Sequence, residues 1–206
     1  MQRKAGWTLA ALFFLPGLLG AQAYKRIDIG ISFAGVLSKD SNSYSRIVEL
    51  KPTNSTEIFG SIRYHFTPKH AVEANFGHIG NAQFFVRPPD TFRVQTSVTE
   101  YTLAYVFSPV QIGHFDPFVL GGVGSLKFNP DNTYVDGFAA NFGAVPRTQL
   151  AFLYGGGTDY RVWRVLNLRL QYRGLFYRAP DFGLSNLFTG SKGHLAEVAG
   201  GIVLKF

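Results

Sequence analysis

The chain contains no cysteine, and after its first twenty residues it has no apolar run long enough for a transmembrane helix. The absence of cysteine excludes a secreted fold held together by disulfides. Any insertion into a membrane must use β-strands, because a helical span needs about 20 consecutive apolar residues. The net charge is +7, but the lysines and arginines are scattered along the chain, so nucleic-acid binding is not expected.

Aromatic residues and glycines, in contrast, are abundant. Aromatics make up 16% of the chain, and there are 23 glycines. Both features suit a β-barrel, because aromatic side chains concentrate at membrane interfaces and glycine lets strongly twisted strands approach closely.

The amino end has the composition of a secretory signal peptide. A short basic segment, residues 1–4, precedes an apolar run over residues 5–20 that a Pro-Gly pair interrupts, and the small residues Ala21 and Ala23 follow at the two positions that a signal peptidase reads. A transmembrane anchor helix is the alternative, but the interrupted run is too short for a span. We therefore predict a cleaved signal peptide over residues 1–23 and one mature domain over residues 24–206.

Eight segments of alternating apolar and polar residues follow, each close to the ~9–11 residues of a tilted transmembrane strand. Their expected ranges are 25–37, 57–66, 71–80, 97–107, 117–128, 148–162, 166–177 and 195–206. Long connections at 38–56, 81–96, 129–147 and 178–194 alternate with short ones. This alternation is typical of outer-membrane barrels, which have long outer loops and short periplasmic turns.

Charged side chains keep to one face of these segments. In the segment 166–177, for example, Leu168 and Leu170 alternate with Arg169 and Gln171. The interior of an eight-stranded barrel is too narrow for an open channel, so charges that line it must be paired. We predict a polar network in the lumen, with Lys205 on the same phase; its members are Arg26, Asp28, Glu57, Arg63, Glu73, Glu100, Lys127, Asp159, Arg161, Arg169, Arg173 and Glu197.

The alternation alone does not say which face points inward, because a secreted lipocalin-type barrel also has eight such strands with its apolar face inside. The alternation of loop lengths and the aromatic residues at both ends of the apolar phase favour a membrane barrel. The aromatics at the short-turn ends are Tyr64, Phe66, Tyr105, Phe107, Phe118, Tyr160 and Phe206, and those at the long-loop ends are Phe33, Phe128, Phe152 and Phe176. We predict an all-β fold, an eight-stranded antiparallel up-and-down transmembrane β-barrel.

The last strand carries the most specific pattern, with Phe206, Leu204 and Ile202 on its apolar phase. It resembles the closing strand of bacterial outer-membrane barrels, and the mature chain resembles the OmpA/OmpX-type family of small outer-membrane barrels. This resemblance implies that these three residues form an insertion signal read by the barrel-assembly machinery. It also implies a monomer in the outer membrane of a Gram-negative bacterium, exported through the periplasm and in contact with outer-membrane lipid and lipopolysaccharide.

Two enzymes on barrels of this size remodel the acyl chains of lipid A, with a histidine, a serine and an acid as the catalytic set. A similar activity here would need His194 as the base, with Ser191 and Glu197 nearby in sequence. The deacylase pattern of a serine two residues after the histidine is absent, since position 196 is alanine. We predict no catalytic residues, cofactor or metal site, and we expect His65 to belong to the polar filling of the lumen.

Three functions remain open. The first is a non-enzymatic surface protein that acts in envelope integrity, adhesion or ligand contact through its long loops. The second is a small-solute channel of the OmpW type, which would need an apolar lumen. The third is a lipid A-modifying acyl hydrolase.

Overall fold

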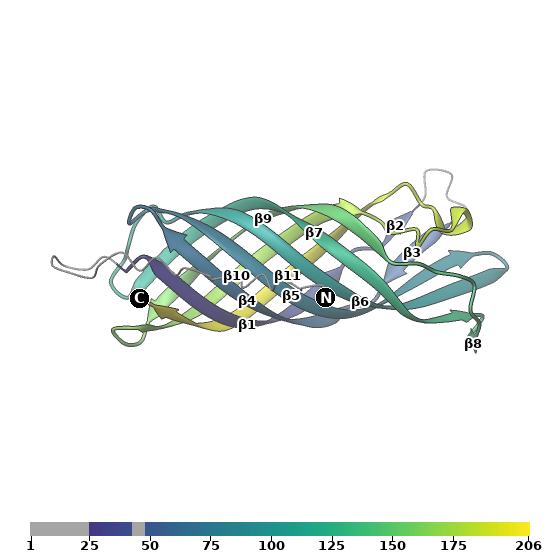
Figure 1. Cartoon of the computed structure of the whole chain (residues 1–206), viewed down its shortest axis with the longest axis horizontal. Coiled ribbons are helices and arrows are strands. Elements are labelled where there is room, and N and C mark those ends of the chain that lie inside the picture. Colours follow the sequence, from purple (N-terminus) through teal and green to yellow (C-terminus); the bar gives the residue numbers. More distant parts are fainter. Residues whose placement is uncertain (1–24, 43–47) are drawn as a thin grey trace, which may run out of the picture.

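The computed structural model describes residues 25–42 and 48–206, and these form an elongated barrel of β-strands (Figure 1). The predicted signal peptide, residues 1–23, lies outside the described residues. In the described part of the chain, the only helix is the short 3-10 helix η1 (Ser185–Leu187). No helix there is long and apolar enough to cross a bilayer.

Eight long antiparallel strands close the barrel, which confirms the predicted fold. They are β1 (Ile27–Ser38), β4 (Ser55–His65), β5 (His70–Arg87), β6 (Asp90–Phe107), β7 (Phe115–Val135), β9 (Arg147–Arg161), β10 (Leu166–Arg178) and β11 (Lys192–Lys205). Each strand pairs with its neighbours in this order, and β1 also pairs with β11.

The two ends of the barrel differ. One end, here the turn end, carries the carboxy terminus and the short turns at 66–69, 108–114 and 162–165. At the other, the loop end, the short strands β2 (Ser41–Asn42) and β3 (Glu49–Pro52) extend the sheet beside β5. Strand β8 (Phe138–Ala139) extends it beside β7. The figure shows β2, β3 and β8 together at the end opposite the carboxy terminus.

The strand register fixes the tilt of the barrel. A row of paired residues that starts at Ile27 passes once around the barrel and returns to β1 at Leu37, ten residues further along. The row is Ile27, Tyr64, Val72, Tyr105, Gly121, Tyr154, Gly174, Ala196 and Leu37. A shear of this size in an eight-stranded barrel corresponds to a strand tilt of about 40°.

The outer surface is an apolar band, because each long strand turns a phase of mostly apolar residues outward. On β1, Ile29 and Ile31 are exposed while Asp28 and Ser32 are buried. The outward apolar residues of this strand run from Ile27 to Leu37. At a tilt of about 40°, ten residues rise about 25 Å along the barrel axis, which is the height of the lipid-facing band in outer-membrane barrels.

Strand β7 faces the opposite way from the sequence-based prediction. Leu126 and Phe128, predicted to point outward, are buried inside, and Lys127, predicted to line the lumen, is exposed on the outside. The strand is apolar on both phases, so its own pattern does not define a face. Pairing decides it: Leu126 lies opposite Glu100, which is fully buried, and paired residues point to the same side of a sheet.

The predicted aromatic belts are correct except on that strand. At the turn end Tyr64, Tyr105, Tyr160 and Phe206 are exposed on the outer surface, and at the loop end Phe33, Phe152 and Phe176 are exposed. Phe118 and Phe128, both on β7, are buried inside instead. The remaining residues form two outward-facing aromatic groups, as expected for the two membrane interfaces.

The connection predicted at 81–96 is not a loop. Strands β5 and β6 continue as a paired hairpin as far as Arg87 and Asp90, joined at Pro88-Pro89. The alternation continues there, since Phe85 and Val94 are buried while their sequence neighbours are more exposed. The sheet therefore projects beyond the membrane band at the loop end (Figure 1).

Candidate functional site

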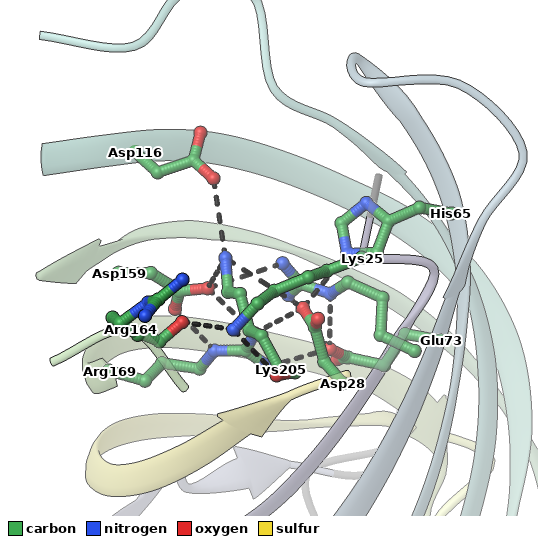
Figure 2. Close-up of polar contacts among 10 residues, drawn as sticks. Lys25, Asp28, His65, Glu73, Asp116, Asp159, Arg164, Arg169 and Lys205 are labelled. Atoms are coloured by element: carbon green, nitrogen blue, oxygen red, sulfur yellow. Dashed lines mark hydrogen bonds and ion pairs between the residues drawn. The ribbon is translucent and has the colours of Figure 1, made fainter. Parts of the chain in front are cut away.

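The turn-end half of the barrel interior holds a connected set of ion pairs (Figure 2). Glu73 Oε2 accepts hydrogen bonds from Arg63 Nε and from Arg169 Nη1, each at 2.8 Å. Arg169 also forms a two-pronged pair with Asp159, in which Nε lies 2.7 Å from Oδ1 and Nη2 lies 3.0 Å from Oδ2. Bidentate, charge-assisted pairs of this kind are both strong and orientation-specific.

Lys205 extends these contacts toward the turn end. Its Nζ lies 3.1 Å from Asp159 and 3.4 Å from Asp116, and Figure 2 shows it between these carboxylates and Asp28. His65 Nε2 lies 2.8 Å from Asp28 Oδ2. We call the whole set the turn-end network; it comprises Asp28, Arg63, His65, Glu73, Asp116, Asp159, Arg169 and Lys205. Three cations and four carboxylates compensate one another, which buried charges require.

The inward-facing Phe118 belongs to this region. The guanidinium of Arg63 lies 4.3 Å from its ring centroid and that of Arg169 lies 5.2 Å from it. A buried aromatic ring can stabilise desolvated cations through its quadrupole. This contact gives β7 a role inside the barrel, although β7 contributes only Asp116 to the ion pairs.

Further toward the loop end lies a glutamate cluster, formed by Glu57, Glu100 and Glu197. One carboxylate oxygen of each lies within 4.8 Å of the others. Arg173 faces them: its Nη2 contacts Glu100 Oε1, and its Nε lies 3.3 Å from Glu197 Oε2. Carboxylate oxygens in this arrangement can share protons or hold a hard divalent cation, while Arg173 already compensates part of their charge.

The sequence offered no signal for the glutamate cluster. Glu57, Glu100 and Glu197 come from β4, β6 and β11, and their spacing matches no ligand motif. Closure of the barrel between β1 and β11 brings the last strand close to the first ones. The sequence predicted correctly that these three residues face the lumen. It did not predict that their carboxylates lie close together.

Above the glutamate cluster, the interior becomes apolar. Two residues nearer the loop end, Val98 and Leu195 take the inward positions beyond Glu100 and Glu197, and Leu175 takes the one beyond Arg173; all three are buried. Phe182 and Leu187, from the segment between β10 and β11, fold into the barrel mouth and are also buried. The rings of Phe182 and Phe85 meet edge to face at 6.1 Å. This loop-end core fills the lumen on that side.

The structure separates the twelve residues predicted for the lumen into two groups. Asp28, Glu57, Arg63, Glu73, Glu100, Asp159, Arg169, Arg173 and Glu197 are buried inside the barrel. The prediction is wrong for Arg26, Lys127 and Arg161, which are exposed. Arg26 precedes β1, and Arg161 ends β9, where its Nη2 donates to Gly113 O at 3.2 Å. Both arginines reach water at the turn end, where pairing inside the lumen is unnecessary.

The candidate His–Ser–acid set is not assembled. His194 faces outward, where its ring lies 4.5 Å from that of Phe176 and its Nε2 lies 3.0 Å from the Tyr154 hydroxyl oxygen. Glu197 is fully buried on the inner face of the same strand. A carboxylate on the other side of the barrel wall cannot orient this imidazole, so the acid of the set is missing.

A polar recess lies on the outside of the loop end. It is lined by Thr53, Asn81, Gln95, Asp131 and Asn132, among others. The amide of Asn132 donates to Gln95 Oε1 at 3.1 Å. Amides, hydroxyls and one carboxylate on an outer surface form a set of donors and acceptors suited to a hydroxyl-rich ligand.

These features agree with the comparison with protein families. Residues 8–190 match the model described as the outer membrane protein beta-barrel domain. The chain belongs to this family, and it is therefore a small outer-membrane β-barrel protein of bacteria. A search of curated proteins gave no match.

Several solved structures share the fold. Neisserial surface protein A has 11% sequence identity and a TM-score of 0.59, with 87% of this chain and 97% of that chain covered. OprG of Pseudomonas aeruginosa has 15% identity and a TM-score of 0.55, with 91% and 99% covered. Ail, the attachment invasion locus protein of Yersinia pestis, has 15% identity and a TM-score of 0.53, with 89% and 100% covered.

Proposed function

We propose that this protein is a non-enzymatic, non-conducting barrel that presents its loop-end sheet to ligands outside the cell. The observation that carries the proposal is the filled interior. The turn-end network, the Arg173–glutamate contacts and the loop-end core occupy successive levels of the lumen. A packed interior supports a scaffold role, because an eight-stranded barrel filled with side chains has no water path.

Strands β5, β6 and β7 continue beyond the apolar band, and β3 and β8 widen the sheet on its two sides. We call this projecting part of the sheet the loop-end sheet, or the platform. On this sheet the guanidinium of Arg93 lies 5.3 Å from the ring centroids of both Phe84 and Tyr134. Cation–π contacts of this kind hold neighbouring strands in register. A rigid surface loses little entropy when it binds a ligand.

Two features of the platform suit ligand contact. The recess around Gln95 and Asn132 offers hydrogen-bonding groups, and Phe138 at its edge strand β8 is 79% exposed. A large exposed aromatic and a set of polar groups on one sheet are the composition found at binding surfaces. Adhesion to a saccharide-bearing or protein surface is the activity that this combination supports best.

The absence of conduction is tested in planar bilayers with the refolded protein. We expect no discrete conductance steps, whereas a water-filled lumen of the OmpW type would give reproducible single-channel events. Such events at neutral pH would overturn the non-conducting assignment. Heat-modifiable mobility of the same preparation on gels is the control, because it shows that a protein without conductance is folded.

The role of the platform is tested by shortening the β5–β6 hairpin. Replacing residues 83–94 with a two-residue turn removes the projecting parts of β5 and β6 and leaves the parts of both strands that lie within the apolar band. We expect the shortened protein to fold and to lose binding on an array of saccharides and extracellular-matrix proteins. Equal binding by both proteins would refute a role for the platform. A double variant, Asn132→Ala with Gln95→Ala, tests the recess alone.

The absence of enzymatic activity is tested separately. Lipid A is analysed by mass spectrometry from cells that express the wild type, His194→Ala or no protein. We expect the same acylation pattern in all three. A change that requires His194 would contradict the proposal and restore the hydrolase hypothesis.

A further inference from the structure

The glutamate cluster carries more negative charge than the protein around it compensates. Glu57, Glu100 and Glu197 supply three carboxylates. Among the described residues, Arg173 is the only cation that forms an ion pair with any of them. Three negative charges and one positive charge leave a formal charge of −2. All four side chains are buried, and an uncompensated charge at this depth is very costly, so the cluster needs further positive charge.

Arg173 uses only some of the oxygen atoms of the cluster. It contacts Oε1 of Glu100 and Oε2 of Glu197. Thr102 Oγ1 donates to the same oxygen of Glu100 at 3.2 Å. The second oxygen of each glutamate receives no hydrogen bond from the part of the chain that the structure describes. These two oxygens are therefore available to a further cation.

Glu57 is the side chain that indicates where such a cation lies. It is 1% exposed, and neither of its carboxylate oxygens accepts a hydrogen bond from any described residue. One of its oxygens nevertheless lies within 4.8 Å of an oxygen of Glu100 and of an oxygen of Glu197. A buried carboxylate that faces two others without a donor is stable only if a positive charge lies among them.

The sheet leaves space for Glu57 to reach this position. Gly77 on β5 pairs in register with Phe59 on β4 and with Glu100 on β6. A Cβ on Gly77 would collide with Oε1 of Glu57. The carboxylate thus occupies the volume that a side chain at position 77 would take, and the glycine lets it extend over β5 toward Glu100.

A buried amide lies beside the cluster. Gln171 is the inward residue that precedes Arg173 on β10, and its register partner Ala199 lies two residues from Glu197. The Gln171 side chain is 3% exposed, and neither its amide oxygen nor its amide nitrogen has a partner in residues 25–42 and 48–206. A buried amide without partners is rare and indicates a polar species next to it. Because Gln171 is uncharged, this observation is independent of the three acids.

We propose that the glutamate cluster binds one calcium ion inside the barrel. Oxygen ligands lie about 2.4 Å from Ca²⁺, so two ligands on opposite sides of the ion are about 4.8 Å apart. The three carboxylates satisfy this limit, and the ion supplies the two positive charges that the cluster lacks. Mg²⁺ fits less well, because its ligands lie at about 2.1 Å in a nearly ideal octahedron.

The free oxygens of Glu57, Glu100 and Glu197 are the protein ligands in this proposal. Ca²⁺ takes six to eight oxygens, and the amide of Gln171 is suited to hold a water molecule of the remaining shell. The ion joins β4, β6 and β11 at the level where the lumen changes from polar to apolar. This inference concerns the interior and does not depend on ligand contact by the platform.

The chain offers a test variant and a matched control. Glu57→Gln removes one carboxylate and keeps the contacts of Arg173 with Glu100 and Glu197. Glu49→Gln makes the same chemical change at an acid that pairs with Lys51 on an exposed surface. Heat-modifiable mobility on gels shows whether each variant is folded.

The binding test uses protein refolded in zwitterionic detergent, free of lipopolysaccharide, in the presence of calcium chloride and then passed over a chelating resin. Elemental mass spectrometry counts the calcium retained per chain. We expect about one ion in the wild type and in Glu49→Gln, and at least about tenfold less in Glu57→Gln. Equal retention by all three proteins would show adventitious surface ions only. No retention by the wild type would show that protons neutralise the cluster instead. Either result would overturn the proposal.

A stability measurement on the wild type decides the question even if Glu57→Gln does not fold. Calcium present during refolding should raise the thermal midpoint above that of protein refolded with EGTA, because the folded state alone assembles the site. Magnesium at the same concentration should raise it less. An unchanged midpoint with calcium would refute the site, and equal stabilisation by both ions would refute its assignment to calcium. If Glu57→Gln folds, its midpoint should not respond to calcium, and a response equal to that of the wild type would exclude Glu57 as a ligand.

Discussion

Arg169 Nη1 and Glu73 Oε2 lie 2.8 Å apart in the barrel interior although the two residues are 96 positions apart in the sequence. Glu73 uses the same oxygen for Arg63 at 2.8 Å. A single carboxylate on β5 therefore joins β4 and β10 across the lumen. This central position of Glu73 makes it the residue whose loss the interior tolerates least.

Glu73→Ala should destabilise the barrel strongly. The substitution leaves the guanidiniums of Arg63 and Arg169 buried with less compensation, and breaking a buried pair in this way costs about 3–5 kcal/mol. Urea unfolding in lipid vesicles, followed by tryptophan fluorescence, measures the change. Glu49→Ala is the control, because Glu49 pairs with Lys51 on an exposed surface and such a pair contributes less than about 1 kcal/mol. Similar losses in both variants would contradict the central role of Glu73.

Two adjacent glycines of β7 should respond oppositely to alanine. A Cβ on Gly122 would lie 2.6 Å from the Cα of Ala104, a backbone atom that cannot move away, whereas the nearest atom to a Cβ on Gly121 is 4.0 Å away. We expect Gly122→Ala to destabilise by about 1–3 kcal/mol, and Gly121→Ala to be neutral or to stabilise by about 0.5 kcal/mol. Equilibrium unfolding of both variants tests this, and equal effects would contradict the close packing of β6 and β7.

The orientation of β7 can be tested by labelling single introduced cysteines, because the chain has no cysteine of its own that would react. Lys127→Cys should react with a membrane-impermeant maleimide added to intact cells, since this side chain is exposed on the outside near the loop end. Leu126→Cys should remain unlabelled until the protein is denatured, because Leu126 is fully buried. The reverse pattern would restore the orientation that the alternation of the sequence predicted.

Phe182→Ala should loosen the barrel mouth and leave the barrel closed. The side chain is fully buried in the loop-end core, and removing a buried phenylalanine costs about 3–5 kcal/mol. We expect faster proteolysis within residues 179–191, with no conductance, because the turn-end network still fills the other half of the lumen. Phe188→Ala is the control in the same segment, since Phe188 is 48% exposed. Conducting events in the Phe182 variant would show that the loop-end core is the only barrier.

On strand β10 the sequence pattern predicted correctly which residues face the lumen and which face outward. Leu168 and Leu170 were predicted outside and Arg169 and Arg173 inside, and the structure places them there. The strand could be predicted because its two phases differ in chemistry, and only one of them can contact lipid. The same reasoning placed Asp28, Arg63 and Glu73 inside.

Strand β7 and the hairpin beyond the band show where the pattern fails. Both phases of β7 are apolar, so Phe118 and Leu126 have no local preference for either face, and Lys127 alone suggested the wrong one. The residues 81–96 contain prolines and polar residues that suggested a loop. Pairing with β3 and β7 and burial of Phe85 and Val94 stabilise them as strands instead. Both outcomes depend on contacts with distant parts of the chain.

The amino-acid sequence by itself determined that this protein is an eight-stranded barrel whose charged phase is enclosed, because a period of two, alternating loop lengths and aromatic residues at both ends of the apolar phase together leave few alternatives. The tertiary structure alone decided which charges meet. The clustering of Glu57, Glu100 and Glu197 inside, and of Arg178 with Lys192 outside, depends on the register and on the closure of β1 against β11. A shift of one residue would separate both groups, since register is a long-range property that local alternation does not encode.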